Sequence, residues 1–246
     1  MKTILEYLST KVAKPGIIKA TNETIHQIVI SELDRLGHDA DLNHIDVSKV
    51  TDMTGLFACD NSTISNLRSV SNDRNPSGID YRDINPDISK WNVSKVENMY
   101  NMFRGCQNLS DLDLSDWNVS NVENMGSLFH FCHKFNSDIS KWDVSNVKDM
   151  GHMLHGCDIF DQDLKDWVVS KVENMEYMFD ACYKFNSNIS KWDVSNVGNM
   201  QGMFEDCKAF DRDISMWDVK NVRSTSRSVF YHCPLREEYK PKFKKQ

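Results

Sequence analysis

The chain lacks the sequence features of a secreted or membrane-spanning protein. It contains no run of roughly 18 or more apolar residues, the length that a membrane-spanning helix needs. Its first ten residues include Glu6 where a signal peptide has an apolar core, and no small-residue cleavage site follows them. We therefore expect a cytoplasmic protein, with the cytoplasm of an infected host or a virion as the alternatives.

Motifs of enzymes and of nucleic-acid binding are lacking as well. The sequence contains no glycine-rich phosphate loop, no nucleophile elbow and no H-E-x-x-H zinc motif. Its formal net charge of −7 disfavours general nucleic-acid binding, which requires a basic surface. We therefore expect no enzymatic activity, no cofactor and no nucleic-acid partner.

What the sequence does contain is a repeat of 25 residues, which we count from its tryptophan. Val follows at positions +2 and +5, and in the central repeats Met follows at +8, Met or Leu at +11, Cys at +15 and Phe at +18. The tryptophans are Trp91, Trp117, Trp142, Trp167, Trp192 and Trp217, of which only the first two are 26 residues apart. A fixed period between roughly 20 and 50 residues indicates stacked structural units.

Within one repeat, the spacing of apolar residues predicts a strand followed by a short helix. Apolar and polar residues alternate from Lys141 through Trp142 to Val144, which is typical of a half-buried strand. From Met150 to Cys157 the apolar residues recur every three or four positions, which is typical of one face of a helix.

We therefore predict an α/β fold, a leucine-rich-repeat-like solenoid of about seven strand–short-helix units whose strands form one parallel sheet. The solenoid is expected over residues 41–233, with a polar inserted loop at 60–83. Residues 1–40 are expected to form an N-terminal helical cap, because apolar residues recur at helical spacing within 21–37. Residues 234–246 are expected to be a basic C-terminal tail.

The repeat resembles that of a known family. Its consensus, W-D-V-S-N-V-x-N-M-x-x-M-F-x-x-C-x-x-F-N-x-D-I-S-x, is similar to the 25-residue repeat of BspA-like leucine-rich repeat surface proteins, which is found in mycoplasma lipoproteins, other bacterial surface proteins and viral genomes. The resemblance covers roughly residues 41–233. It implies a leucine-rich-repeat-like solenoid that acts in adhesion or protein binding without catalysis. We see no lipobox cysteine near the start and no cell-wall anchor, which favours a cytosolic or phage-encoded relative that binds an intracellular protein.

Two sets of polar or reactive residues are too regular for a local active site. The cysteines of one set are Cys106, Cys132, Cys157, Cys182, Cys207 and, with an offset, Cys233. Because disulfide frameworks and metal sites need close cysteine pairs, we interpret them as buried free thiols in a reducing compartment, with a redox or metal ladder as the alternative. For the Asp and Asn residues at −4 and +7 we expect turn chemistry, with Ca²⁺ binding as the alternative.

Four histidines form a candidate cluster. His130 and His155 share position +13, and His152 and His133 lie near them in the sequence. Converging imidazoles are able to hold a transition metal. We find no carboxylate at a matching position and therefore favour an exposed helix face that contains several histidines, while metal binding stays open.

The residues that break the repeat are the predicted partner-binding residues. Val168 replaces Asp or Asn at +1, and Met216 replaces Lys or Asp at −1, and apolar anchors inside a polar rim are typical of binding hot spots. The predicted surface of the sheet consists of Lys141, Asp143, Asp166, Val168, Lys191, Asp193, Met216 and Asp218. The inserted loop adds Arg68, Arg74 and Tyr81. Ordinary variation on a solvated surface and a disordered loop are the alternatives.

Together these observations predict a non-enzymatic protein–protein interaction module that binds a protein partner through the sheet face and the inserted loop. A phage or virus is the expected source, with a host protein as the partner. The alternative function is a structural or adhesive component of a cell surface or virion.

Overall fold

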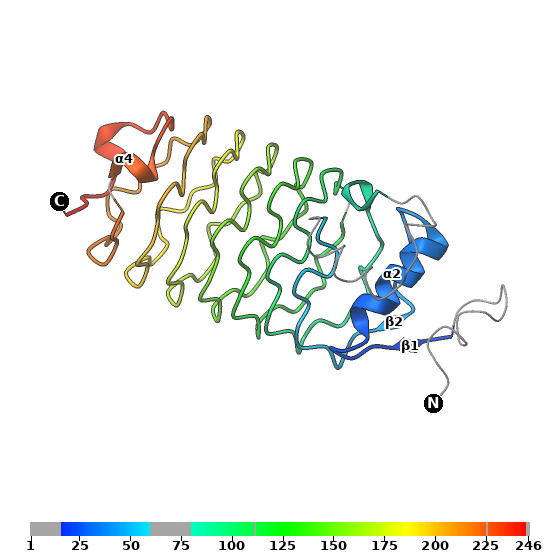
Figure 1. Cartoon of the computed structure of the whole chain (residues 1–246). Helices are drawn as coiled ribbons and strands as arrows, with labels where there is room; N and C mark the ends of the chain where they lie inside the picture. Colours follow the sequence, from blue (N-terminus) through cyan, green and yellow to red (C-terminus); the bar gives the residue numbers. More distant parts are fainter. Residues whose placement is uncertain (1–15, 60–79, 111, 225, 245–246) are drawn as a thin grey trace.

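The chain is folded as a row of coils that lie side by side, one coil for each repeat (Figure 1). The computed structural model describes residues 16–59, 80–110, 112–224 and 226–244. Helix α2 (Ile25–Leu36) lies at one end of the row and the short helix α4 (Ser226–Val229) at the other. Helix α2 falls inside the range in which the sequence predicts a helix.

The predicted α/β fold, a solenoid of strand–helix units that form one parallel sheet, is wrong. Within the described residues the strands are β1 (Ile18–Lys19) and β2 (Ile45–Asp46), which have two residues each and pair in parallel. Besides α2 and α4, this part of the chain contains the 3₁₀ helices η1 (Tyr81–Asp83) and η2 (Glu237–Tyr239). Isolated parallel bridges at position +7 connect successive repeats, at Asp52–Asn98, Asn98–Asn124, Asn124–Asp149, Asp149–Asn174 and Asn174–Asn199.

Turns occupy the segment in which a strand was predicted. The Oδ1 of Asp138 accepts a hydrogen bond from the amide N–H of Ser140 at 2.9 Å, and the Oδ1 of Asp143 accepts one from Ser145 at 3.1 Å. Between them, the N–H of Trp142 donates to the carbonyl three residues earlier. Short side-chain acceptors compete with a strand ladder for backbone amides, and here the turns form instead of a strand. Buried and exposed residues still alternate around Trp142. The turn chemistry predicted at position −4 is confirmed.

Left-handed residues interrupt the predicted short helix. His152 has φ 56° and Gly156 has φ 73°, whereas an α-helix needs φ near roughly −63°. The equivalent positions +10 and +14 of other repeats also have positive φ, at Asn101, Ser127, Tyr177, Gly202, Gly105, Phe131, Ala181 and Asp206. The apolar spacing of three to four residues comes instead from consecutive turns, such as the bond from the Met153 N–H to the Met150 carbonyl at 3.1 Å.

Backbone groups that a helix would pair internally connect neighbouring repeats instead. The amide N–H groups of Met150, His152 and Leu154 donate to carbonyls of the next repeat, with N···O distances of 2.9, 2.6 and 3.1 Å. At position +7, the Oδ1 of Asp149 accepts the amide N–H of Gly151 at 2.8 Å, which confirms the predicted turn chemistry there. The repeats are therefore held together by a regular set of bonds between partners one repeat apart.

The apolar residues of the repeat stack into columns inside the row. The rings of Trp117 and Trp142 are 6.5 Å apart and nearly parallel, and those of Trp167 and Trp192 are 6.3 Å apart. Each of these indoles is buried, and the Nε1–H of Trp142 donates to the carbonyl of Leu114 at 3.2 Å. Burial of a large apolar side chain stabilises a fold by roughly 1.5–3 kcal/mol, so the columns account for the cohesion of the stack.

The cysteine column is part of this interior. Cys106, Cys132, Cys157, Cys182 and Cys207 are fully buried and free. The Sγ of Cys157 donates to the carbonyl of Phe129 at 3.2 Å, and burial raises the pKa of this thiol well above its usual value. The interpretation of these residues as buried free thiols is confirmed.

Both ends of the row cover the apolar interior. The buried residues of α2 are Ile25, Ile28, Val29, Glu32 and Leu33, and β1 lies beside β2 with Ile18 opposite Ile45. At the other end, the ring of Phe243 packs edge-on against Phe230 at 6.3 Å. Stacked repeats need such ends, because the outermost unit otherwise exposes its core side to water. Among the described residues, no helix has the length and apolar character that crossing a membrane requires.

Candidate functional site

The residues on either side of the tryptophans lie at the surface. Val168 and Met216 are 55% and 89% exposed. The charged residues of the same set, Lys141, Asp143, Asp166, Lys191, Asp193 and Asp218, are exposed as well. They lie on turns at positions −1 and +1 and not on a sheet, and we call these eight residues the Trp-flanking surface.

The residue at +1 normally stabilises a turn. The Oδ1 of Asp193 accepts the amide N–H of Ser195 at 3.0 Å, and the hydrogen bonds with Ser195 hold the pKa of this carboxyl below its usual value. The same bond is made by Asn92, Asn118, Asp143 and Asp218. The side chain of Val168 has no oxygen that accepts such a bond. This repeat therefore forgoes an interaction worth roughly 0.5–1.5 kcal/mol and exposes an apolar side chain in its place.

Met216 makes a similar contrast at position −1. The other repeats have Lys90, Asp116, Lys141, Asp166 and Lys191 there. Val168 and Met216 lie two repeats apart, with Lys191 and Asp193 between them, and the successive tryptophan rings of these repeats are 6.3 and 6.4 Å apart. Burial of apolar area stabilises a fold by about 25 cal/mol per Å², and these exposed side chains gain little of it, so the stability of the isolated chain does not explain either residue.

The inserted loop adds little to this surface in the part that the structure describes. Arg68 and Arg74 lie outside the described residues. Tyr81 begins η1 and is only 6% exposed, and its carbonyl accepts a bond from the Cys59 thiol at 2.7 Å. Tyr81 is therefore buried in this structure, and its contact with a partner stays a prediction.

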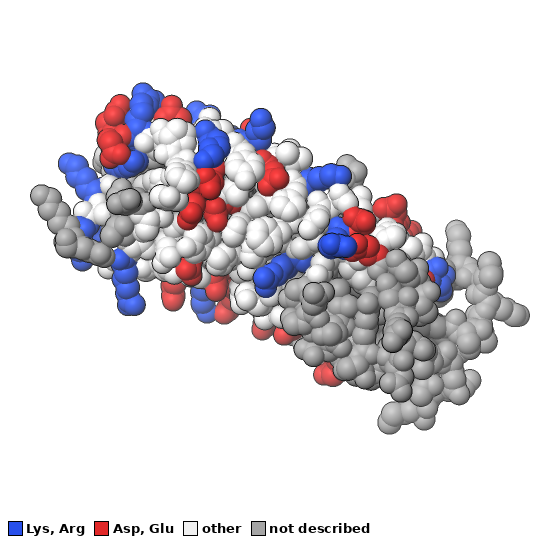
Figure 2. Space-filling model, turned by 45° about the horizontal axis from the view of Figure 1, so that its top comes forward, with Lys and Arg blue, Asp and Glu red and all other residues white. Residues whose placement is uncertain are grey.

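A polar cleft that we did not predict from the sequence lies elsewhere on the repeats. It measures about 1000 Å³ and is lined by positions +4 to +9 of four successive repeats: Lys148, Lys171, Glu173, Asn174, Asn196, Gly198, Asn199, Gln201, Arg223 and Ser224. Its available sequence signal was Gly198, which stands at +6 where neighbouring repeats have Lys148, Glu173 and Arg223. Figure 2 shows charges of both signs mixed over one face of the molecule, with uncharged regions between them.

The histidines do not lie on a helix face. His130, His152 and His155 come together on the turns of two neighbouring repeats, and one ring nitrogen from each lies within 4.8 Å of the others. His133 is not in this group, and its Nδ1 lies 3.3 Å from the Oδ1 of Asp158. The predicted exposed helix face is wrong, because His130 is buried and His152 and His155 are half-buried.

Burial keeps these three imidazoles uncharged near neutral pH. Together with repulsion by the neighbouring histidines and Arg104, it lowers the pKa of His130 to about 3 and that of His155 to about 4. The pKa of His152 is also lowered, again mainly by burial. Neutral imidazole is the form of histidine that binds a metal ion.

Asp180 completes the group and was missed in the sequence. Its Oδ2 lies 3.2 Å from the Nε2 of His155. Burial, with added repulsion from Glu205 and Asp206, raises the pKa of Asp180 to about 7. The available signal was its position, because Asp180 stands at +13, the same position as His130 and His155.

Comparison with known proteins places the chain in a family. The model of a family described as Mycoplasma protein of unknown function, DUF285, matches residues 77–184 and residues 160–237. The two matches overlap and together cover well over half of the 246 residues. No curated protein and no solved structure matches the chain. The chain is therefore a repeat protein that belongs to the DUF285 family.

Proposed function

We propose that this chain is a non-enzymatic binding module that holds a protein partner on its Trp-flanking surface, with Val168 and Met216 as apolar anchors. The observation that supports this most directly is the 55% and 89% exposure of two apolar side chains at positions where other repeats have polar residues. A few apolar anchors within a charged rim typically supply most of the binding free energy of a protein interface.

The stacked repeats suit a binding role. The turns at Asp143 and Asp193 in the Trp-flanking surface are fixed by side-chain hydrogen bonds, and the tryptophan column lies below the surface. A rigid surface loses little conformational entropy when it binds, so more of the contact energy appears as affinity. We further propose that the repeat is of the BspA-like type, which the Trp-Val-Met-Cys-Phe pattern supports, and that the free thiols reflect a reducing compartment.

The experiment restores the repeat residues at the two anchors. The double variant Val168→Asp and Met216→Lys replaces each anchor by the residue type of other repeats and leaves the net charge unchanged. We expect it to fold normally and to lose, in crosslinking pull-downs from cell extract, a protein that the unchanged chain retains in a saturable manner. A matched control, Asp116→Asn with Asn118→Asp, alters positions −1 and +1 of a different repeat, also without net charge change, and should retain that protein.

Two results decide against this function. Equal retention of every bound protein by both double variants would show that the anchors make no contact. The second comes from fractionation of the native source. If this protein co-purified with an envelope or particle fraction at constant stoichiometry, a structural or adhesive role would be favoured.

A further inference from the structure

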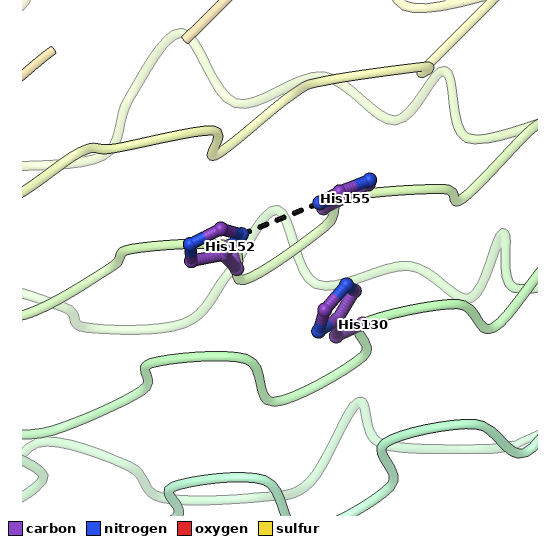
Figure 3. A group of neighbouring side chains, drawn as sticks. All are labelled: His130, His152 and His155. Atoms are coloured by element: carbon purple, nitrogen blue, oxygen red, sulfur yellow. Dashed lines mark hydrogen bonds between the residues drawn. The ribbon is translucent and has the colours of Figure 1, made fainter. Parts of the chain in front are cut away.

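Three imidazole rings face a common space between two neighbouring coils (Figure 3). His152 and His155 come from one coil and His130 from the coil beside it. The coils are joined at this point by a hydrogen bond of 2.7 Å from the amide N–H of Phe131 to the carbonyl of His155. The backbone that positions the rings is therefore fixed, and it does not have to be ordered by a ligand.

The distances between the ring nitrogens fit one small metal ion. The Nδ1 atoms of His152 and His155 are 3.3 Å apart, and one nitrogen from each of the three rings lies within 4.8 Å of the others. A tetrahedral zinc ion with metal–nitrogen bonds of roughly 2.0–2.1 Å separates its ligand nitrogens by roughly 3.3 Å. Two of the rings thus already have the spacing that a tetrahedral ion requires, and a nitrogen of the third lies within 4.8 Å of them.

His130 has a polar atom that the described part of the chain leaves unsatisfied. Its Nε2 is buried and has no hydrogen-bond partner among the described residues. Buried polar groups in folded proteins are nearly always paired, and each exception requires an explanation. A bound ion beside this ring supplies one.

Asp180 holds His155 from the outer side. Its carboxylate lies 3.2 Å from the Nε2 of His155, which leaves the Nδ1 of that ring directed at His152. A carboxylate on the outer nitrogen of a metal-binding histidine orients the ring and makes the inner nitrogen a better ligand. The neighbouring repeat therefore provides the outer partner that such sites use.

We propose that His130, His152 and His155 bind one divalent transition-metal ion, with Zn²⁺ as the preferred occupant and Asp180 as the residue that positions His155. Three neutral nitrogen ligands suit zinc, cobalt, nickel or copper, whereas magnesium and calcium prefer oxygen. Three protein ligands leave a fourth position for water or for a group from a partner. The proposal does not depend on the Trp-flanking surface.

The test uses the full-length chain after treatment with a chelator. Titration calorimetry with Zn²⁺ at pH 7.5 should give one site per chain, and Co²⁺ should give the visible absorption of a tetrahedral nitrogen-ligated ion. His152→Asn should weaken Zn²⁺ binding at least roughly tenfold. Asparagine is chosen because it tolerates the left-handed φ of 56° at this position.

A matched control is available at the end of the chain. His232 also has a left-handed φ, 54°, and is exposed outside the cluster, so His232→Asn should bind Zn²⁺ like the unchanged chain. Asp180→Asn keeps all three ligands and should weaken binding by roughly 10–100-fold, which is typical for loss of an outer-shell carboxylate. This variant also serves if His152→Asn does not fold.

Three outcomes overturn the proposal. The first is the absence of saturable Zn²⁺ binding below millimolar concentration in the unchanged chain. The second is unaltered affinity in the folded variants of His152 and Asp180. The third is a Co²⁺ spectrum with intense thiolate charge-transfer bands, which would assign the ion to cysteines instead.

Discussion

The adjacent repeats that begin at Trp142 and Trp167 differ far more at the surface than inside. Both bury their Trp, Val, Met, Cys and Phe columns to nearly the same extent. At position +1, however, the first repeat has Asp143 and the second Val168, and at +13 the first has His155 and the second Asp180. Interior rings stack on the equivalent ring of a neighbouring repeat, Trp142 on Trp117 and Trp167 on Trp192, so a change there disturbs the contact between repeats. The exposed position +1 is free of that constraint. The half-buried position +13 is not, because His155 contacts both His130 and Asp180 there, and its variation creates a site between repeats.

The largest expected effect tests whether the two interiors are equivalent. Trp142→Ala and Trp167→Ala should each lower the free energy of unfolding by about 3–5 kcal/mol, because each removes a buried ring from its stack and leaves a cavity. Each also removes an indole N–H that donates to a carbonyl of the preceding repeat, at 3.2 and 3.1 Å. Urea denaturation measures both values.

A substitution of an exposed residue serves as the control for these two buried ones. Val168→Ala should change the free energy of unfolding by less than about 0.5 kcal/mol, since the side chain is largely exposed. If only one of the two tryptophan variants were strongly destabilised, the interiors would not be equivalent.

An intermediate effect concerns His155 and Asp180, the two residues at position +13. Burial shifts their pKa values in opposite directions. Burial lowers the pKa of His155 from 6.5 to about 4, so between these values the unfolded chain binds a proton that the folded chain does not, and stability falls as the pH falls. Burial raises the pKa of Asp180 from 3.8 to about 7, so in this window the folded chain binds the extra proton and stability rises as the pH falls.

Single variants should separate these opposing contributions. In metal-free buffer, Asp180→Asn should lose thermal stability more steeply than the unchanged chain between pH 7 and pH 4, and His155→Gln should lose it less steeply. After allowance for solvent screening we expect a difference on the order of 1 kcal/mol, or about 2–4 °C in Tm. Parallel curves of Tm against pH for the two variants would contradict the assignment of these groups.

The smallest expected effect exchanges the residues at position +1. Val168→Asp should raise the free energy of unfolding by about 0.5 kcal/mol, because the new carboxylate can accept the turn hydrogen bond that Asp143 makes with the Ser145 amide at 3.1 Å, and a bond exposed to water lies at the low end of the usual range. Asp143→Val should lower it by a similar amount. Chemical denaturation at pH 7 measures both.

The stability that Val168→Asp is expected to gain should depend on pH, and this dependence provides a control. Hydrogen bonding with Ser145 lowers the pKa of Asp143, so this stabilisation is present above the unfolded pKa and is lost as the pH falls through the folded pKa. The advantage of Val168→Asp should therefore shrink in acid. A gain that persists unchanged at pH 2 would assign it to some other cause.

The sequence by itself determined which residues are inside. Trp142 and Cys157 could be assigned to the interior because each recurs with the 25-residue period, and a stacked unit places equivalent residues in equivalent surroundings. The exposure of Val168 and Met216 could be expected for the same reason, since each replaces a polar residue of the repeat. Asp180 was also accessible to this reasoning, because it shares its position with His155.

Only the tertiary structure decided the backbone conformation and the sites between repeats. Alternation around Trp142 and the spacing from Met150 to Cys157 fit a strand and a helix, but they also fit a chain of turns. The choice depended on the left-handed φ of His152 and on amide groups whose acceptors lie one repeat away. Local patterns contain no information about such distant partners. The sequence grouped His130, His133, His152 and His155 as a candidate cluster, but only the coils placed side by side showed that three of them come together and that His133 does not.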